Sequence, residues 1–554
     1  MNSLKINRIT VPIILLFITI GTVTPQIVTP WFTSGDKSRL LEQQPTVNFV
    51  QKTAATSVIV TVDQATTYQT MDGFGYCMTE GSAEVISSLN ASQQAVLLNE
   101  LFNPSTGLGI SVLRISIGAS DLSSTNYSYD DTPADEALAN FSLTGPDLTY
   151  LIPILQKVLA INPTLKIVAT PWSPPRWMKT NNAWVGGSLN TFYYAAYAAY
   201  FVKYIDAMKA LGISIWAITP QNEPENPNNN PSMSMTSSEE TNFINNNLGP
   251  ALANGGHSNV RIIAYDHNCD DTAYPIYVCN NSSYVDGAAF HLYAGNISAL
   301  STVKNATNKN IYFTEQYTGS TGSFSGDLGW HLQNVIIGAS NNWSKTSIEW
   351  NLATDPAFGP HTSGGCSTCQ GAITINSSTS YSRNVAYYII GQISKFVPSG
   401  AVRIYGSSSN SNFYASAFKN PDGTIAVVTY NNLNSSQIVK MVWNAQSFLY
   451  SVPALSAATF IWSTAPNALP EIQSSRISIS PNPGHSFVTL KLQDHELNFT
   501  SISFITPEGK TAMSQSILTE SEENTINVSG LAPGIYLIKV SGPKESIYVR
   551  FIKQ

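Results

Sequence analysis

Charged residues are scarce in this sequence. Lysine, arginine, aspartate and glutamate together make up 11% of the 554 residues, against roughly 25% in an average soluble domain. The formal net charge is −7, and no block of like charge occurs. A chain without a basic stripe cannot follow a phosphate backbone, so these features exclude a nucleic-acid-binding function. A hydrophobic share of 43% excludes disorder, and an uncharged polar surface suits a neutral, polar partner.

Long hydrophobic runs are absent after the N-terminus. Lys5 and Arg8 precede a single apolar run from Val11 to Val23, which small and polar residues follow. This order is typical of a signal peptide, predicted here over residues 1–26. The run has about 13 residues, fewer than the roughly 20 of a membrane-spanning helix. We therefore expect a secreted or cell-surface protein without a stable membrane span; a membrane anchor is the alternative.

Cysteines are also few, and their spacing argues against a metal site. Cys366 and Cys369 lie in the sequence GGCSTCQG, and Cys269 and Cys279 are ten residues apart. A structural zinc site needs four ligands, usually as two CxxC pairs, and the second pair is missing. These four cysteines are therefore disulfide candidates in an oxidising compartment, with the CxxC pair favoured, and no metal is predicted. Cys77 is predicted to be a small buried hydrophobic residue.

Short β-like runs recur between residues 71 and 384, at intervals that leave room for a helix between each pair. Helices are predicted over 93–102, 151–161 and 191–211 from their apolar periodicity. Eight strands with intervening helices predict a (β/α)8 barrel, and an open doubly wound sheet is the alternative, although no glycine-rich loop follows the first run. The eight runs are Met71–Tyr76, Val112–Ile117, Lys166–Pro171, Ile215–Pro220, Arg261–Tyr265, Asp286–Phe290, Ile311–Thr314 and Ser347–Trp350.

The segments on both sides of the barrel have a different character. Residues 27–55 show no period and are interpreted as a linker, whereas the run VIVTV at 58–62 places the first strand of a side β-domain within 56–70. Residues 385–465 alternate in hydrophobicity between Asn/Gly turns and predict the rest of that β-sandwich domain. A second linker is predicted over 466–475. Residues 476–554 consist of short apolar runs bounded by Pro or Gly, which predict a separate all-β domain.

Polar and aromatic residues follow seven of the eight barrel runs. In a (β/α)8 barrel these positions converge on the C-terminal face, where active sites lie. Any one of them is more often structural, but the whole set is poorly explained by chance. They are Arg114 and Asp121, Trp172, Asn222 and Glu223, Asp266 and His267, His291 and Tyr293, Glu315, and Trp350 and Asn351.

Glu223 and Glu315 are the candidate catalytic pair. Glu223 lies in WAITPQNEPEN on a loop that Pro224 keeps out of a helix, and Glu315 ends the run IYFTEQY. They follow the fourth and seventh runs, which face each other across a barrel mouth. Hydrolysis of a glycosidic bond with retention needs two carboxyl groups about 5–5.5 Å apart, one protonated and one ionised. The alternative is that either glutamate caps a helix or pairs with Arg114.

The neighbouring residues fit a sugar-binding pocket. Asn222 is placed to donate to a sugar 2-OH, and Trp172 and Trp350 offer flat apolar faces, although packing is the more frequent role of such tryptophans. Asp121 and Arg114 either bind hydroxyl groups or form a structural ion pair.

A second group of strand-end residues is less specific. His291 and Tyr293 are expected to hydrogen-bond the nucleophile and keep it ionised. The sequence does not distinguish Asp266 and His267 from supporting residues, and Asp72, Glu80 and Glu225 are interpreted as structural or rim residues.

These motifs resemble glycoside hydrolase family 30, which contains glucosylceramidases and endo-β-1,6-glucanases. The resemblance implies that Glu223 is the acid/base, that Glu315 is the nucleophile, and that no cofactor is needed. It also implies a sugar pocket lined by Arg114, Asp121, Trp172, Asn222, His291, Tyr293 and Trp350, and a side β-domain built from both flanks of the barrel. The matching segments are DGFGYCMTEGSA (72–83), LRISIGASDLS (113–123), TPWSPPRWMKTN (170–181), TPQNEP (219–224), FHLY (290–293), FTEQ (313–316) and EWNLATDPAFGP (349–360).

Two further features concern substrate and export. After GP the sequence reads HTSGGCSTCQGAITI, which differs from the lipid-cleaving glucosylceramidases and favours a β-linked glucan or glucoside over glucosylceramide. The last segment, with ISPNP, LAPGIYLIKV and Lys553, resembles the sorting domain of type IX secretion and implies contact with that machinery. The hypothesis is a secreted retaining β-glycosidase. The alternatives are a non-catalytic carbohydrate-binding or adhesion protein on an inactive barrel, and the same chemistry on xylan or a fucoside.

Overall fold

The structure is a computed structural model that describes residues 26–143, 145–464, 477–492, 499–506, 510–517, 523–542 and 546–554. Nearly all of the predicted signal peptide and the whole predicted linker 466–475 lie outside these ranges. Residues 25–464 form one compact unit, and the C-terminal segment from residue 465 belongs to another. Among the residues described, no helix is long and apolar enough to cross a membrane.

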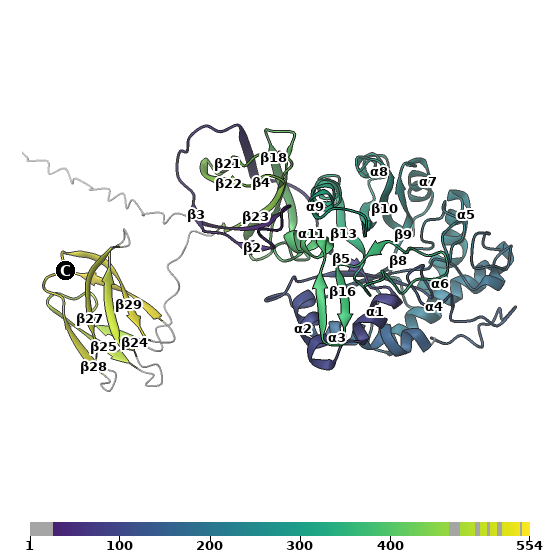
Figure 1. Cartoon of the computed structure of the whole chain (residues 1–554), viewed down its shortest axis with the longest axis horizontal. Helices are drawn as coiled ribbons and strands as arrows, with labels where there is room; N and C mark the ends of the chain where they lie inside the picture. Colours follow the sequence, from purple (N-terminus) through teal and green to yellow (C-terminus); the bar gives the residue numbers. More distant parts are fainter. Residues whose placement is uncertain are drawn as a thin grey trace, which may run out of the picture. The chain divides into compact units, whose positions relative to one another are not determined.

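Eight parallel strands form a closed barrel, as the sequence predicts (Figure 1). Each strand coincides with one of the eight predicted runs, and the strands are hydrogen-bonded in the order β10-β11-β13-β5-β6-β7-β8-β9. Their bounds are β5 Gly73–Cys77, β6 Val112–Ser116, β7 Lys166–Thr170, β8 Ala217–Ile218, β9 Arg261–Cys269, β10 Val285–Gly295, β11 Asn310–Glu315 and β13 Ser344–Asn351.

Helices cover the outside of the barrel, and the three predicted helices are present (Figure 1). The α-helices are α1 Glu80–Ser87, α2 Ala91–Phe102, α3 Ile152–Ile161, α4 Tyr194–Ala210, α5 Ser237–Phe243, α6 Gly249–Asn254, α7 Ala273–Asn281, α8 Ala299–Thr307, α9 Phe324–His331, α10 Ala339–Asn341 and α11 Val385–Ser394. Shorter helical turns are η1 Asp147–Leu151, η2 Arg176–Met178, η3 Thr191–Tyr193, η4 Ile244–Leu248 and η5 Leu332–Gly338.

The barrel interior is packed with side chains rather than open. Alternate residues of a strand point inward, and each of the eight strands contributes at least one residue to a single buried cluster. A larger hydrophobic cluster joins the outer faces of the strands to the helices. The interior members are Cys77, Val112, Val168, Ala217, Ile263, Ala289, Tyr312 and Ile348. This filled interior holds the strand ends rigidly, and the strand ends carry the candidate site.

A ten-stranded sheet forms the side domain and corrects one boundary. The run at 58–62 belongs to β4 Val58–Thr70, as expected, but residues 27–34 are not a linker. They form β1 Ile27–Ser34, which pairs with β23 along six residues because both strands present buried side chains on one face. The remaining strands are β2 Glu42–Gln43, β3 Val47–Asn48, β18 Val402–Ser408, β19 Phe413–Lys419, β20 Thr424–Asn431, β21 Gln437–Trp443, β22 Gln446–Val452 and β23 Ser456–Ser463.

Helix α11 joins the side sheet to the barrel. Every residue of this helix is buried, and it contacts β5 of the barrel as well as β1 and β23 of the sheet. The polar Gln392 is satisfied across this junction, since its side chain donates to the Thr33 hydroxyl over 2.7 Å and accepts from the Thr459 hydroxyl over 2.8 Å. The two domains therefore share one rigid contact.

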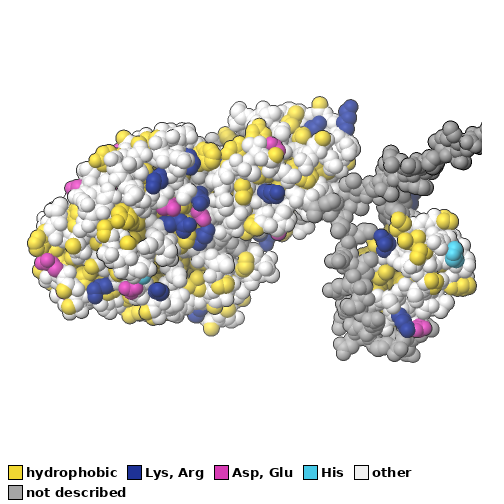
Figure 2. Space-filling view, turned by 180° about the vertical axis from the view of Figure 1, so that it is seen from behind, with side chains coloured by type: hydrophobic (Ala, Val, Ile, Leu, Met, Phe, Trp, Pro, Cys, Tyr) yellow, Lys and Arg dark blue, Asp and Glu magenta, His cyan; other side chains and the backbone are white. Residues whose placement is uncertain are grey.

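The C-terminal unit is an all-β fold, as predicted. Its described strands form one sheet in the order β24-β25-β28 and another in the order β27-β26-β29-β30 around a hydrophobic core of its own. The strands are β24 Ile477–Ser480, β25 Phe487–Leu492, β26 Ser501–Ile505, β27 Thr511–Ser516, β28 Glu523–Asn527, β29 Gly534–Ser541 and β30 Ser546–Lys553. Figure 2 shows charged side chains scattered over a mostly uncharged surface, in keeping with the composition.

Candidate active site

Glu315 ends strand β11 and lies among buried donors. Its Oε2 accepts from Arg114 Nη1 over 2.6 Å, and its Oε1 accepts from the Tyr293 hydroxyl over 2.9 Å. Burial raises the pKa of Glu315, while His291 and Arg114 counteract this effect. Because each oxygen has its own donor, the carboxylate is fixed in orientation and its ionised form is stabilised.

Glu223 lies on the loop after β8 and faces a different set of partners. Its Oε1 is 3.1 Å from His291 Nδ1, and its Oε2 accepts from Asn226 Nδ2 over 2.8 Å. The residue has φ 46°, in the left-handed region that a non-glycine residue rarely adopts. Its amide donates to the Asp266 carbonyl over 3.0 Å, which helps to hold this conformation. Strained backbone of this kind is common at functional sites.

Asp266 connects the two halves of the site, a role that the sequence did not reveal. Its carboxylate accepts from Arg114 Nη2 over 2.9 Å and lies 3.1 Å from His291 Nε2. Thr219 and Thr314 donate to the same carboxylate over 2.8 and 2.7 Å. Although burial works in the opposite direction, Arg114 and His291 hold the pKa of Asp266 far below its usual range. A permanent negative charge therefore orients both the arginine and the histidine.

His291 and Glu223 share one proton across their hydrogen bond. Burial alone would lower the pKa of His291, but the Glu315 charge and the hydrogen bonds to Asp266 and Glu223 raise this pKa to about 9. Burial acts to raise the pKa of Glu223, but the hydrogen bond and charge of His291 lower it. The proton therefore rests on the histidine side of the 3.1 Å hydrogen bond. Moving it across that bond gives a protonated Glu223 and a neutral His291 that still donates to Asp266.

The two carboxylates open into one cavity of about 400 Å³. Predicted residues in its lining are Asp121, Tyr293 and Trp350 besides the two glutamates, and further residues that the sequence did not single out are Asn226, Asn228, Asn229, Asn268 and Tyr317. Burial, Glu315 and Glu223 raise the pKa of Asp121 to about 7. The other predicted pocket residues, Arg114, Trp172, Asn222 and His291, are not part of this lining. Trp172 is 2% exposed and packs with its ring 4.7 Å from the Arg114 guanidinium. Its face therefore supports the arginine.

The predicted CxxC disulfide is present and lies in the same cavity. Cys366 and Cys369 are bonded, and both line the wall beside Asp121 and Trp350. The other candidate pair is wrong, because Cys269 and Cys279 are free and buried. Cys269 ends strand β9 and its thiol contacts the His291 carbonyl at 3.2 Å, whereas Cys279 lies in helix α7. Cys77, the fifth cysteine, is buried as predicted.

Opening this disulfide is expected to weaken substrate binding more than it slows the chemistry. Cys369 is held next to the nucleophile strand, because β15 Cys369–Gln370 pairs with β12 Thr318–Gly319. In a variant carrying Cys366→Ser and Cys369→Ser, we expect KM to rise about five-fold, equivalent to roughly 1 kcal/mol, with kcat nearly unchanged. Steady-state kinetics of the variant and of the wild type under a reducing agent would measure this. Equal falls in kcat and kcat/KM would show that the loop positions the catalytic groups instead.

One group of described residues also has the spacing of metal ligands. Ligand atoms of Glu223, His291 and Glu315 all lie within 4.8 Å of one another. A cation there would have to displace the His291–Glu223 hydrogen bond and share Glu315 with the Arg114 guanidinium at 2.6 Å. Because a positive charge already occupies this side of Glu315, the donor set fits proton transfer better than metal binding.

A closed (β/α)8 barrel whose mouth holds two facing carboxylates, each with its own donors, defines the class of barrel glycoside hydrolases. The chain belongs to glycosyl hydrolase family 30, as its motifs suggested. The family's TIM-barrel domain matches residues 71–397 and its β-sandwich domain matches residues 400–460. A secretion system C-terminal sorting domain matches residues 478–554, which marks the protein for secretion or the cell surface.

Similar proteins support the same family. The endo-1,6-β-D-glucanase neg1 of Aspergillus fumigatus is 38% identical over 72% of this chain and 86% of its own length. Putative glucosylceramidase 4 of Caenorhabditis elegans is 31% identical over 81% of this chain and 89% of its own length. Among solved structures, the endo-β1,6-glucanase BT3312 is 37% identical, with a TM-score of 0.75 over 79% of this chain and 99% of that chain. The protein is thus a retaining O-glycoside hydrolase by family.

Proposed function

We propose that this protein is an exported retaining β-glucanase that cleaves β-1,6-linked glucan, with Glu223 as the acid/base and Glu315 as the nucleophile. One observation carries the assignment of the pair: an oxygen of each carboxylate lies within 4.8 Å of the other, and each carboxylate has a different set of partners. Such a short separation leaves no room for a water between carboxylate and sugar, as inversion requires, and favours a covalent intermediate.

In the first step, Glu315 attacks the anomeric carbon while Glu223 protonates the departing glycosidic oxygen. As the ester bond forms, Glu315 loses its charge, and the leaving oxygen takes the proton that His291 and Glu223 share. Arg114 keeps Glu315 ionised beforehand through its 2.6 Å contact, and Tyr293 aims the second oxygen. The Asn222 side-chain oxygen accepts from Arg114 over 2.6 Å, which leaves its amide group to donate to the sugar 2-OH.

In the second step, Glu223 acts as a base. It takes a proton from a water molecule that attacks the anomeric carbon from the side of the departed group, and the bond to Glu315 breaks. Two inversions at one carbon restore the β configuration. His291 accepts the proton back across its hydrogen bond with Glu223, so the site returns to its starting state.

The lining of the cavity favours a glucan over a glycolipid. Four asparagines and Asp121 offer hydrogen bonds to hydroxyl groups, and Trp350 offers the face of its ring to a sugar. A ceramide tail would need an extended apolar surface at the mouth instead. Relatives named as endo-1,6-β-D-glucanases match at 36–38% identity, and those named as glucosylceramidases match at 28–33%. Glucosylceramide is the second candidate substrate.

Export by a signal peptide over residues 1–26 completes the proposal. The apolar run after Lys5 and Arg8 supplies the first signal, and the C-terminal sorting domain at 478–554 supplies the second, which requires passage through a type IX machinery. An exported enzyme meets polymeric glucan outside the cell. Mass spectrometry of the secreted protein would test this: we expect a new N-terminus near residue 26, and an intact Met1 would contradict it.

A panel of substrates tests the proposed activity. The purified protein would be incubated with a β-1,6-glucan, glucosylceramide, xylan and an aryl β-glucoside, and the products would be followed by chromatography and by NMR of the newly formed anomeric centre. We expect β-1,6-linked oligosaccharides whose first-formed anomer is β. Release of ceramide without cleavage of the glucan would reassign the substrate, an α first product would exclude retention, and no product from any substrate would favour a non-catalytic barrel.

Replacing His291 is expected to narrow the active pH range. In the wild type, the shared proton is lost only as the pH rises through the histidine pKa of about 9. In His291→Asn the proton must stay on Glu223 alone, and a carboxyl group loses it at a lower pH. The alkaline limb of kcat/KM should therefore move to lower pH by at least about one unit. A pH profile of both proteins would measure this, and an unmoved limb in a folded variant would show that His291 does not hold the proton.

A further inference from the structure

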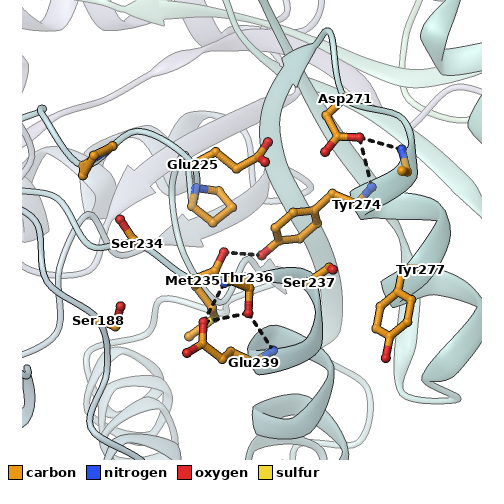
Figure 3. Close-up of a pocket in the computed structure, with 13 residues that line it drawn as sticks. Ser188, Glu225, Ser234, Met235, Thr236, Ser237, Glu239, Asp271, Tyr274 and Tyr277 are labelled. Carbon is orange, nitrogen blue, oxygen red and sulfur yellow. Dashed lines mark hydrogen bonds between the residues drawn. The ribbon is translucent and has the colours of Figure 1, made fainter.

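A second cavity, of about 680 Å³, is lined in part by residues of the loop that carries Glu223, and Glu225 is one of them (Figure 3). Residues 223–229 form the wall between the two cavities. Glu223, Asn226, Asn228 and Asn229 line the catalytic cavity, whereas Pro224, Glu225 and Pro227 line the second one. The same short segment thus presents one set of side chains to each side.

The second cavity has the surface chemistry of a site for neutral sugars. Tyr277 on α7 is 45% exposed and contributes an aromatic face, and Ser188, Ser234 and Ser237 contribute hydroxyl groups. None of the described residues that line it is Lys, Arg or His, so an anionic ligand would find no partner. Pro224, Pro227, Met235 and Ala273 supply apolar contact between these polar groups.

Several lining groups are fixed by hydrogen bonds and keep the cavity open. Asp271 Oδ1 accepts from the amides of Ala273 and Tyr274 at the start of α7, over 2.7 and 3.2 Å. The Tyr274 hydroxyl donates to the Met235 carbonyl over 2.9 Å. Thr236 and Glu239 cap the start of α5 reciprocally. Figure 3 shows these bonds around the cavity. The walls are therefore preorganised before any ligand arrives.

Glu225 is the acidic group of this lining that takes no part in capping a helix, and the Tyr265 side chain is its neighbour within the protein. Its side chain is exposed, and burial together with the charges of Asp271 and Asp270 raises its pKa. A sugar hydroxyl that donates to the Glu225 carboxylate would stabilise its negative charge, which the charges of Asp271 and Asp270 disfavour.

The position of the acid/base indicates which part of the substrate would lie near the second cavity. Glu223 hands its proton to the oxygen of the departing part of the substrate, so that part must lie against the loop that carries Glu223. The second cavity is on the far side of this loop. A 1,6-linkage includes a freely rotating exocyclic carbon, which lets a glucan chain bend around this loop.

We propose that the second cavity is a distal binding site for the departing side of the glucan chain, in which Tyr277 stacks on a glucose ring and Glu225 accepts a hydroxyl proton. This proposal rests on the glucanase activity proposed above. It extends the substrate contact beyond the catalytic cavity and makes chain length a determinant of rate.

Two variants of the full chain test the site, Tyr277→Ala and Glu225→Gln. The matched control is Tyr405→Ala, which removes a tyrosine of similar exposure, 38%, from strand β18 of the side sheet. Each would be assayed on linear β-1,6-gluco-oligosaccharides of increasing length and on an aryl β-glucoside. For Tyr277→Ala we expect kcat/KM on the long oligosaccharides to fall about three- to ten-fold, the value of one aromatic contact, with the aryl glucoside unchanged. Glu225→Gln should show a smaller fall in the same pattern.

The outcomes separate this proposal from the one it rests on. Calorimetric binding of a long oligosaccharide to Glu315→Gln, with and without Tyr277→Ala, reports on the cavity without turnover. Tyr277-dependent binding with no cleavage of any oligosaccharide by the wild type would overturn the proposed activity alone. If cleavage and binding of the oligosaccharides were the same with and without the Tyr277 and Glu225 substitutions, the distal site alone would be overturned. An equal fall in kcat/KM on the aryl glucoside would have the same meaning. If Ca²⁺, and no oligosaccharide, raised the Tm in a manner lost in Glu225→Gln, the cavity would be a cation site.

Discussion

In Glu315→Gln, kcat/KM on β-1,6-glucan is expected to fall by about 10⁴-fold or more, because the amide cannot form the covalent bond to the sugar. The side chain keeps its shape, and its carbonyl oxygen can still accept from Arg114. Asp266 remains to neutralise the guanidinium at 2.9 Å. We therefore expect a folded, substrate-binding and inactive protein. Steady-state kinetics, with thermal unfolding as a check on the fold, would measure this effect.

A matched control and a label complete this test. Glu349→Gln makes the same change in a buried carboxylate of the neighbouring strand β13. Glu349 forms a 2.7 Å hydrogen bond with His331 Nδ1 and does not line the catalytic cavity. This variant should keep near-normal kcat. A fluorinated glucoside that traps the intermediate loses its leaving group, so the mass of the fluorinated glucosyl group should be added to the wild-type peptide that contains Glu315 and to no other. A label on another carboxylate would move the nucleophile there.

The barrel could be predicted because its signal is local. Each strand is a short buried run, and the interval to the next run leaves room for a helix, so all eight strands were placed from the sequence. The same local reasoning failed at residues 27–34. Strand β1 contains Pro30 and alternates weakly, and it is defined by its partner β23, more than 400 residues later in the chain. A short strand that depends on so distant a partner leaves no local pattern.

The sequence predicted which residues form the candidate site but not the hydrogen bonds and ion pairs that join them. Strand ends gave both glutamates, Arg114 and His291, because a barrel brings all strand ends to one face. Asp266 was not distinguishable, because its importance comes from four partners on three other strands and one loop. Its backbone also has φ 53°, and nothing in the sequence around Asp266 predicts this conformation. Likewise, a tryptophan after a strand does not reveal whether its face meets sugar or arginine, and Trp172 meets Arg114.

The disulfide was also only partly predictable from the sequence. The CxxC spacing indicated the bond between Cys366 and Cys369, but only the pairing of β15 with β12 brings it into the catalytic cavity. For Cys269 and Cys279 the spacing of ten residues was no guide, because one cysteine lies in a strand and the other in the following helix. A strand and its helix pack through apolar side chains, and here each cysteine serves as one of them.

Glu223→Ala is expected to separate substrates by the quality of their leaving group. On β-1,6-glucan, whose departing alcohol needs a proton, kcat/KM should fall by about 10²- to 10⁴-fold, the usual contribution of a general acid. On a dinitrophenyl β-glucoside, whose departing phenolate needs none, the first step should proceed nearly as in the wild type. The intermediate on Glu315 should then accumulate, because the base that activates water is missing. A burst of phenolate followed by slow turnover would show this.

Azide provides the decisive complement to this variant. It is a small anion that needs no base, and it can enter the space left by the Glu223 side chain to attack the intermediate, which releases Glu315 and forms a β-glucosyl azide. We expect azide to restore turnover of the dinitrophenyl glucoside in Glu223→Ala and to have no effect on Glu225→Ala, whose carboxylate lies two residues along the same loop and lines the other cavity. Because both stereochemical inversions still occur at one carbon, the azide product must be the β anomer. An α-glucosyl azide would mean that azide attacks the substrate directly, in which case Glu315 would not be the group that first displaces the sugar.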